Sequence, residues 1–377
     1  MEKYATWVQR SKDVQLNISI NDQPFAEFAV ENVGAIMELI GPQAERWRSL
    51  QLDQVPFENI CIFLDRVKER SLPLLERLCV VESSNGFRLS GEPYCPSLGR
   101  VAFDAPRLKE LELVGIVADF DCPLFHNLHS LNITDFYFSK LGLPVAKDTI
   151  HQLLRQSPHL KQLHFRYPLS LAMLPYQRAR TPPPVNEDTL THSSLLDLTL
   201  AFRAGVQDVI LPFTRFPALR SFHLPRQSQI TLDSWHLPLL VRNSPFPSLK
   251  RVTLCGNLSD HQYDRFLVDA LSTLASLEGL GLAKFDMTQV ADALPTLGHA
   301  CPRLRSLSLH RCVRVDLQQV RSLVSTRRQA DGVTRLRQLY IYNGMDDTLE
   351  VLNATGAWLK ARVEKVILFG DGKYVRL

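Results

Sequence analysis

The sequence predicts an α/β solenoid, in which short parallel strands stack along one face and helices cover the other. Three observations predict it. The pattern Leu-x-x-Leu-x-Leu returns from one end of the 377 residues to the other, its copies stand 20 to 35 residues apart, and several intervals show helical periodicity. Such units are typical of leucine-rich repeats, in which each unit adds one strand to a curved sheet. We therefore expect a horseshoe with the strands on its concave face and the helices on its convex face.

The clearest copies of the repeat begin with Pro, and they are Pro106–Leu113, Pro158–Phe165, Pro217–Leu224, Pro247–Leu254 and Pro302–Leu309. Weaker copies stand at Leu50, Leu78, Leu131, Leu198, Leu280, Leu339 and Val366. We take the penultimate apolar residue of each copy as its anchor, which gives about twelve units in a single domain over residues 1–377. Because the end units of a solenoid need a cap, residues 1–45 are expected to form an N-terminal capping region.

Helices are expected in the longer intervals. From Asp260 to Leu274 the apolar residues recur on one helical face, and Asp260 is a suitable N-cap. The stretches 148–154, 286–297 and 316–324 each begin with Asp and have the same pattern. These helices would cover the convex side.

Residues 167–194 interrupt the repeat with a proline-rich stretch that includes Arg178 to Pro184. Proline cannot continue a helix or a central strand, so we interpret this region as a loop insertion at one edge of the solenoid. It is either a variable loop or a peptide-docking or Thr-Pro phosphorylation site, and loops commonly accumulate such sequence.

Composition argues against several partners. The chain has 43 Lys and Arg against 39 Asp and Glu, a net charge of +4, and no polybasic run, so neither nucleic acid nor an anionic membrane is an expected partner. It has no apolar stretch near the length of a membrane span and no signal-peptide core. Seven cysteines without regular spacing fit reduced thiols, so a cytoplasmic or nuclear location is expected.

Candidate chemical sites have structural explanations. Cys122, His126 and His129 resemble half a zinc site, but the two histidines flank a repeat leucine and no second pair follows. Cys312 occupies the repeat position where a small buried residue turns the chain after the strand, and Cys301 opens the same repeat unit, so both are expected to be structural. We find no phosphate-binding glycine loop and no nucleophile motif. No enzyme activity, catalytic residue, metal or cofactor is therefore expected.

The residues that alternate with the anchors are expected on the concave face, where a protein partner would bind, because side chains alternate along a strand. Two patches stand out on this face as candidate partner-binding residues. A basic middle patch consists of His164, Arg166, His223 and Arg251, and an aromatic C-terminal patch of His310, Tyr340 and Tyr342. Tyr and Arg are enriched in binding hot spots, although strands also carry aromatic residues for packing alone.

Three features resemble fungal, basidiomycete-type F-box/leucine-rich-repeat proteins. These are the unit from Cys301 to Cys312, the repeat spacing, and an opening in which Trp7–Ser11 precedes a strand-like Leu16–Ile20. Arg46–Leu52 resembles a second early repeat of the same type. The resemblance spans essentially the whole chain.

The resemblance implies a substrate receptor of a cullin-based ubiquitin ligase, in which an F-box binds a Skp-type adaptor and the repeats bind the target. The chain departs from the family because no F-box, with its Leu-Pro-x-Glu opening, is recognisable in it. Binding of the adaptor and cullin is therefore expected only if an F-box precedes Met1. The alternative is a free-standing leucine-rich-repeat scaffold or inhibitor without a link to ubiquitin transfer.

Overall fold

The computed structural model has two compact units, residues 1–174 and 175–377. The boundary falls inside the predicted 167–194 insertion, of which residues 167–189 lie outside the described residues. The prediction of a single domain over 1–377 therefore stays a prediction. The structure describes residues 2–21, 30–68, 70–82, 103–116, 122–134, 143–166, 190–201, 214–224, 246–255, 271–290, 299–342, 349–370 and 373–376.

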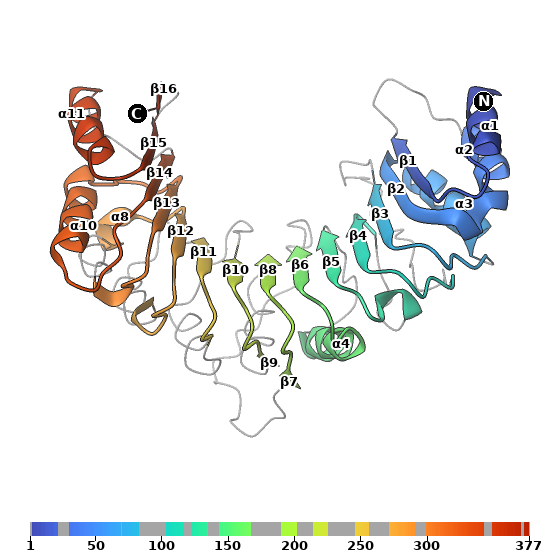
Figure 1. Cartoon of the computed structure of the whole chain (residues 1–377), viewed down its shortest axis with the longest axis horizontal. Coiled ribbons are helices and arrows are strands. Elements are labelled where there is room, and N and C mark those ends of the chain that lie inside the picture. The colour runs from blue at the N-terminus through green and yellow to red at the C-terminus, as the bar shows by residue number, and fades with distance from the viewer. Residues whose placement is uncertain are drawn as a thin grey trace. The chain divides into compact units, whose positions relative to one another are not determined.

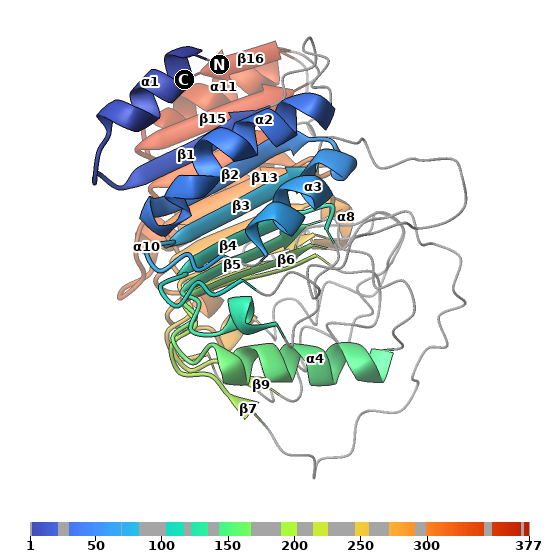
Figure 2. The same ribbon diagram turned by 90° about the vertical axis from the view of Figure 1, so that its right-hand side faces the viewer.

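The sheet of the first unit consists of parallel strands that follow one another in chain order (Figure 1). Its strands are β1 (Leu16–Asn21), β2 (Trp47–Val55), β3 (Arg77–Glu82), β4 (Glu110–Val114), β5 (Ser130–Thr134) and β6 (Gln162–Arg166). Helix α1 (Glu2–Arg10) precedes β1. The connections between the strands contain α2 (Val30–Ile40), the 3-10 helix η1 (Gly41–Arg46), α3 (Phe57–Val67), the 3-10 helix η3 (Pro123–Phe125) and α4 (Leu143–Gln156). Figure 2 shows α2 and α3 along one face of β1 to β3.

The second unit repeats this arrangement with β8 (Asp197–Ala201), β10 (Ser221–Leu224), β11 (Arg251–Cys255), β12 (Gly279–Ala283), β13 (Ser306–His310), β14 (Gln338–Tyr342) and β15 (Lys365–Gly370), all parallel. Helices α8 (Met287–Val290), α10 (Leu317–Gln329) and α11 (Leu349–Lys360) lie on one side of its strands (Figure 1). The predicted leucine-rich-repeat solenoid is therefore confirmed.

The twelve anchors are in register. In the first unit Leu50, Leu78, Leu111, Leu131 and Leu163 face one another on successive strands. In the second unit the same holds for Leu198, Phe222, Val252, Leu280, Leu307, Leu339 and Val366. None of these side chains is more than 3% exposed. Each repeat thus packs its apolar row against the rows of the neighbouring repeats, and in this way a repeat that cannot fold alone acquires a core.

Both ends of the chain add a strand beyond the twelve. Leu16–Asn21, within the expected capping region, forms β1 and pairs in parallel with β2, so that Ile18 faces Leu50. At the other end β16 (Lys373–Arg376) runs antiparallel to β15 and covers the edge of that strand. The outer strand is then β16, which has only four residues, and a very short edge strand limits edge-to-edge aggregation.

The helix predictions have mixed outcomes. Asp316 is the N-cap of α10, with its carboxylate accepting a hydrogen bond of 2.7 Å from the backbone N–H of Gln318. The helix predicted at 148–154 is longer in the structure, as α4, and the one at 286–297 is seen as α8, with residues 291–298 outside the described residues. Residues 260–270 of another predicted helix also lie outside them. Of the predicted loop insertion, Leu190–Thr191 forms β7, which pairs with β9 (Thr214–Arg215).

Candidate functional site

In each unit the strands have an exposed face formed by the residues that alternate with the anchors. On β4, β5, β11, β12 and β14 the alternating residues are exposed or half-buried while the residues between them are buried. This side-chain alternation is the one that the repeat predicts. The predicted partner-binding residues all lie on such faces, with His164 and Arg166 on β6 of the first unit and His223, Arg251, His310, Tyr340 and Tyr342 in the second.

The predicted aromatic patch forms a continuous row of rings. His310 and Tyr342 are directly opposite on β13 and β14, with ring centroids 5.5 Å apart. Tyr342 in turn lies opposite Phe369 on β15, at 6.4 Å. Tyr340 stacks on Tyr342 from two residues away on the same strand, at 6.4 Å and an interplanar angle of 5°. These residues, His310, Tyr340, Tyr342 and Phe369, are called the aromatic row below.

Phe369 was not among the partner-binding residues predicted from the sequence. The signal was available, because the two-residue strand period that places Lys365 on the exposed face continues through Ile367 to Phe369. In the structure Phe369 is half-buried and completes the row on β15. The register also places Tyr374 of β16 opposite Phe369.

A positive charge lies next to the aromatic row. The Nζ atom of Lys365 is 5.3 Å from the centroid of the Tyr340 ring, which is within the range of a cation–π contact. Ser306 and Ser308, on the strand that pairs with β14, present only small side chains on the exposed face. The rings and Lys365 therefore stand beside a stretch of sheet with low side-chain cover.

The predicted basic patch divides between the two units. His164 and Arg166 are exposed at the end of β6 in the first unit. His223 and Arg251 belong to neighbouring strands of the second unit, where His223 pairs with Thr253, and Arg251 with Ser221. The two are diagonal neighbours, in adjacent rows of the face. A single surface made of all four residues stays a prediction.

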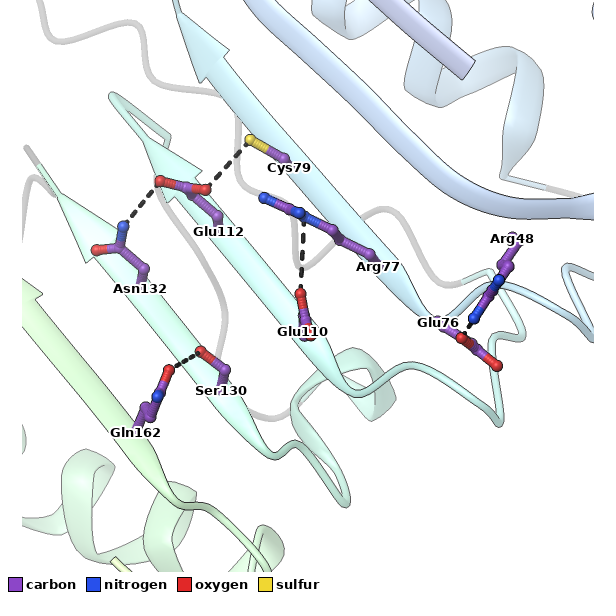
Figure 3. Close-up of polar contacts among 9 residues, drawn as sticks. All are labelled: Arg48, Glu76, Arg77, Cys79, Glu110, Glu112, Ser130, Asn132 and Gln162. Carbon is purple, nitrogen blue, oxygen red and sulfur yellow. Dashed lines mark hydrogen bonds and ion pairs between the residues drawn. The ribbon is translucent and has the colours of Figure 1, made fainter. Parts of the chain in front are cut away.

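The exposed face of the first unit is occupied by polar contacts between its own side chains, which Figure 3 shows. Glu112 is at the centre, because one carboxylate oxygen accepts a hydrogen bond of 2.8 Å from Asn132 and the other lies 3.4 Å from the Cys79 Sγ atom. Ser130 donates to Gln162 at 3.3 Å. A partner would have to replace these bonds rather than satisfy free groups, which reduces the net gain from binding there.

Ion pairs join neighbouring strands of the first unit at the edge where the strands begin. Arg48 lies 3.0 Å from Glu76, and Arg77 lies 3.7 Å from Glu110. Arg48 also lowers the pKa of Glu76, chiefly through this hydrogen bond. Arg48, Arg77 and Glu110 are exposed and Glu76 is half-buried, so water screens both pairs and each contributes little to stability.

Three of the described cysteines, Cys79, Cys301 and Cys312, are suited to packing rather than to nucleophilic chemistry. Burial first, and then the Glu112 carboxylate, raise the pKa of Cys79 to about 12. Burial likewise raises the pKa of Cys301 and of Cys312 to about 11. Thiols with such values are protonated at neutral pH and therefore weak nucleophiles. Both Cys301 and Cys312 are fully buried, each with its sulfur near a backbone carbonyl of the preceding repeat, in agreement with the structural role predicted for them.

Cys122, His126 and His129, which resemble half a zinc site in the sequence, do not form a metal site in the described part of the chain. Cys122 is buried, whereas His126 is exposed and His129 half-buried. No group of three or more His, Cys, Asp or Glu side chains with metal-binding geometry occurs among the described residues.

In the described part of the chain there is no helix long and apolar enough to cross a membrane.

Comparison with known proteins shows a likeness to solved structures. No family model matches the sequence, and no curated protein matches it. Among solved structures, the chain is similar to the leucine-rich-repeat-containing protein LegL7 from Legionella pneumophila. The identity is 14%, the match covers 96% of this chain and 93% of that one, and the TM-score is 0.43.

Proposed function

We propose that the chain recognises a protein partner, and that the partner binds the exposed face of the sheet in residues 175–377. The observation that carries this proposal is the aromatic row, four rings held in mutual contact on the side of the sheet opposite to the core. Aromatic side chains bury a large area at a low cost in conformational entropy, and they are enriched at the centres of protein interfaces. Because these rings already contact one another before binding, less side-chain conformational entropy is lost when the partner binds.

The test is the double substitution Tyr340→Ala with Tyr342→Ala, compared with Tyr340→Phe and Tyr342→Phe. The alanine form removes the stacked pair, and we expect the Kd for the co-purifying partner to rise about thirtyfold or more, since the loss of even one hot-spot residue costs about 2 kcal/mol. The phenylalanine form keeps the stack and should bind nearly as well as the unchanged chain. Both rings lie outside the core, so the thermal unfolding of both forms should remain close to that of the unchanged chain. An unchanged Kd in the alanine form would rule the aromatic row out as the binding surface.

A finer proposal is that this recognition serves a ubiquitin ligase, with the chain as the substrate-binding part of an F-box-type receptor. Its support is the resemblance to F-box/leucine-rich-repeat proteins, together with contacts between the two early stretches that carry this resemblance, Trp7–Ile20 and Arg46–Leu52. The Arg46 guanidinium donates to Ser11 Oγ at 2.7 Å and to the Val14 carbonyl oxygen at 2.7 and 3.1 Å, and the next residue, Trp47, is fully buried. The two stretches thus form one structural start of the repeat array.

Co-purification from the host cell tests this finer proposal. A form extended upstream of Met1 is compared with the present chain, and bound proteins are identified by mass spectrometry. Recovery of a Skp-type adaptor and a cullin with the extended form supports the ligase role. If the extended form recovers neither, the ligase role is rejected and the free-standing scaffold or inhibitor becomes the better account.

A further inference from the structure

The two units differ in charge. Residues 175–377 contain 25 Lys and Arg against 18 Asp and Glu, whereas residues 1–174 contain 18 against 21. The small net charge of the whole chain therefore hides a positive second unit and a slightly negative first one. An excess of one sign on one unit selects partners of the opposite sign and speeds their association.

Part of this excess lies along the edge where the strands of the second unit begin. The residues at or directly before the first position of β10 to β15 include six exposed cations, which we call the cationic edge: Arg220, Lys250, Arg251, Arg305, Arg337 and Lys365. The acids at the corresponding positions are Glu278 and Glu364, with Asp197 on the flanking strand β8. Lys250 pairs with Glu278 at 3.0 Å, and Arg337 with Glu364 at 3.6 Å.

Glu278 shows how this edge holds a carboxylate. Its pKa is lowered, first by the hydrogen bond from Lys250 and further by the charges of Lys250, Arg305 and Arg251. One carboxylate thus lies among three cations, and the local charge remains positive. A second carboxylate, supplied by a partner, would find the same donors, and Arg guanidinium groups match carboxylate geometry well.

Two glycines on β12 leave this part of the face low, and one of them brings a cation close to the backbone. A Cβ atom added at Gly279 would lie 3.4 Å from Cγ of Arg251, so the stem of Arg251 leans across a position that has no side chain of its own. At Gly281 an added Cβ would lie 3.0 Å from Oγ1 of Thr253. With Ser306 and Ser308 on the next strand, this part of the face is covered only by small groups between the cationic edge and the aromatic row.

The dimensions suit a short peptide segment. Along a strand, four residues or about 13 Å separate the cationic edge from the aromatic row. Across the strands, four strand spacings or about 19 Å separate Arg251 from Lys365. An extended segment of about six residues spans such distances. The contact between Lys365 and Tyr340 joins the two rows into one surface.

We propose that this surface binds an acidic peptide segment of a partner protein, with carboxylates at the cationic edge and an aromatic or apolar side chain against the aromatic row. The inference rests on the proposed function and adds the chemical class of the partner. Nucleic acid fits less well, because Glu278 and Glu364 interrupt the cationic edge and would repel a continuous line of phosphates.

The probe is an array of fluorescein-labelled Glu-rich peptides in which the position of a single Phe varies, together with the same peptides with Gln in place of Glu. Binding to the full chain is measured by fluorescence anisotropy at low and high salt. We expect the Glu peptides to bind, the Gln peptides to bind at least about tenfold more weakly, and salt to weaken the binding of the Glu peptides. A labelled single-stranded oligonucleotide is measured beside them.

The test variant is Arg251→Gln with Arg305→Gln, and its matched control is Arg155→Gln with Lys161→Gln in the first unit. All four side chains are exposed and both variants remove two positive charges, so net charge alone predicts equal effects. We expect the test variant to lose affinity for the Glu peptides by about tenfold and the control to retain it.

Three outcomes would overturn the inference. These are failure of every Glu peptide to bind, equal losses in the test variant and the control, or tighter binding of the oligonucleotide through the same arginines. The proposed function has a separate readout in the tyrosine pair and the co-purified partner. If the tyrosine variant loses that partner while the Glu peptides do not bind, only the acidic-segment inference fails.

Discussion

Arg327 offers the sharpest test of how the second unit is held together. It lies on α10 and is only 1% exposed, although arginine is rarely buried. Its guanidinium donates to four backbone carbonyls, with distances of 3.0 Å to Cys301, 3.2 Å to Pro302, 2.7 Å to Leu304, and 2.7 and 3.1 Å to Thr334. One side chain thus ties the helix to the turn before β13 and to the segment before β14. Burial lowers its pKa, but the group stays charged because arginine titrates far above neutral pH.

The cost of Arg327→Ala can be worked out from these contacts. Hydrogen bonds from a charged donor contribute about 1.5–3 kcal/mol each, but burying the charge has already cost several kcal/mol. Removing the side chain leaves buried carbonyls without this donor and a cavity beside α10. We therefore expect a loss of about 3–5 kcal/mol in the free energy of unfolding, which lowers Tm by about 10 °C in a unit of this size. Arg327→Lys should lose about 2 kcal/mol, since an ammonium group cannot reach all four carbonyls.

The assay is urea unfolding followed by far-UV circular dichroism, with Arg328→Ala as the control. Arg328 is the next residue of the same helix and is exposed, so its substitution should change stability by less than about 0.5 kcal/mol. A loss below about 1 kcal/mol for Arg327→Ala, or equal losses at the two positions, would refute the reasoning.

Two further predictions concern local stability. Replacing Asp316 by Ala should cost about 1 kcal/mol in urea unfolding through loss of the α10 N-cap, and Asp316→Asn should restore most of it; equal losses for Ala and Asn would contradict the capping role. For Cys79, the folded pKa of about 12 exceeds the ordinary thiol value of 9.0. Above pH 9 the unfolded thiol therefore loses its proton first, and stability falls as pH rises. The curve of unfolding free energy against pH should therefore be flatter for Cys79→Ala, by up to about 1.4 kcal/mol per pH unit above pH 9, and parallel curves would count against this.

The strand register could be predicted from the sequence because the residues that define the repeat are also the residues that face one another on neighbouring strands. Leu280 and Leu307, for example, are the anchors of their repeats and also face each other on β12 and β13. A register slip of one residue would turn these leucines to the exposed face, so the apolar period alone determines the pairing. The aromatic patch followed for the same reason, because Tyr340 and Tyr342 alternate with Leu339 and Ile341.

The remaining features depend on contacts between distant residues. Arg327 continues the buried stripe of Leu317, Val320 and Val324, but its charge argues against burial until the carbonyls around it are known. The local excess of cations around Glu278 likewise requires knowing that residues 250, 278 and 305 become neighbours along one edge. The antiparallel β16 follows β15 after a short connection and lacks the repeat pattern, so the period gave no sign of it.

The central claim is that a protein partner binds the face that carries the aromatic row, and site-specific photo-crosslinking in the host cell tests it most directly. A photoreactive benzoylphenylalanine is placed at position 340 in one form of the chain and at position 328, on the exposed side of α10, in another. We expect the form labelled at 340 to become covalently joined to the co-purifying partner and the form labelled at 328 to remain free of it. Crosslinking of the partner from 328 but not from 340 would contradict it.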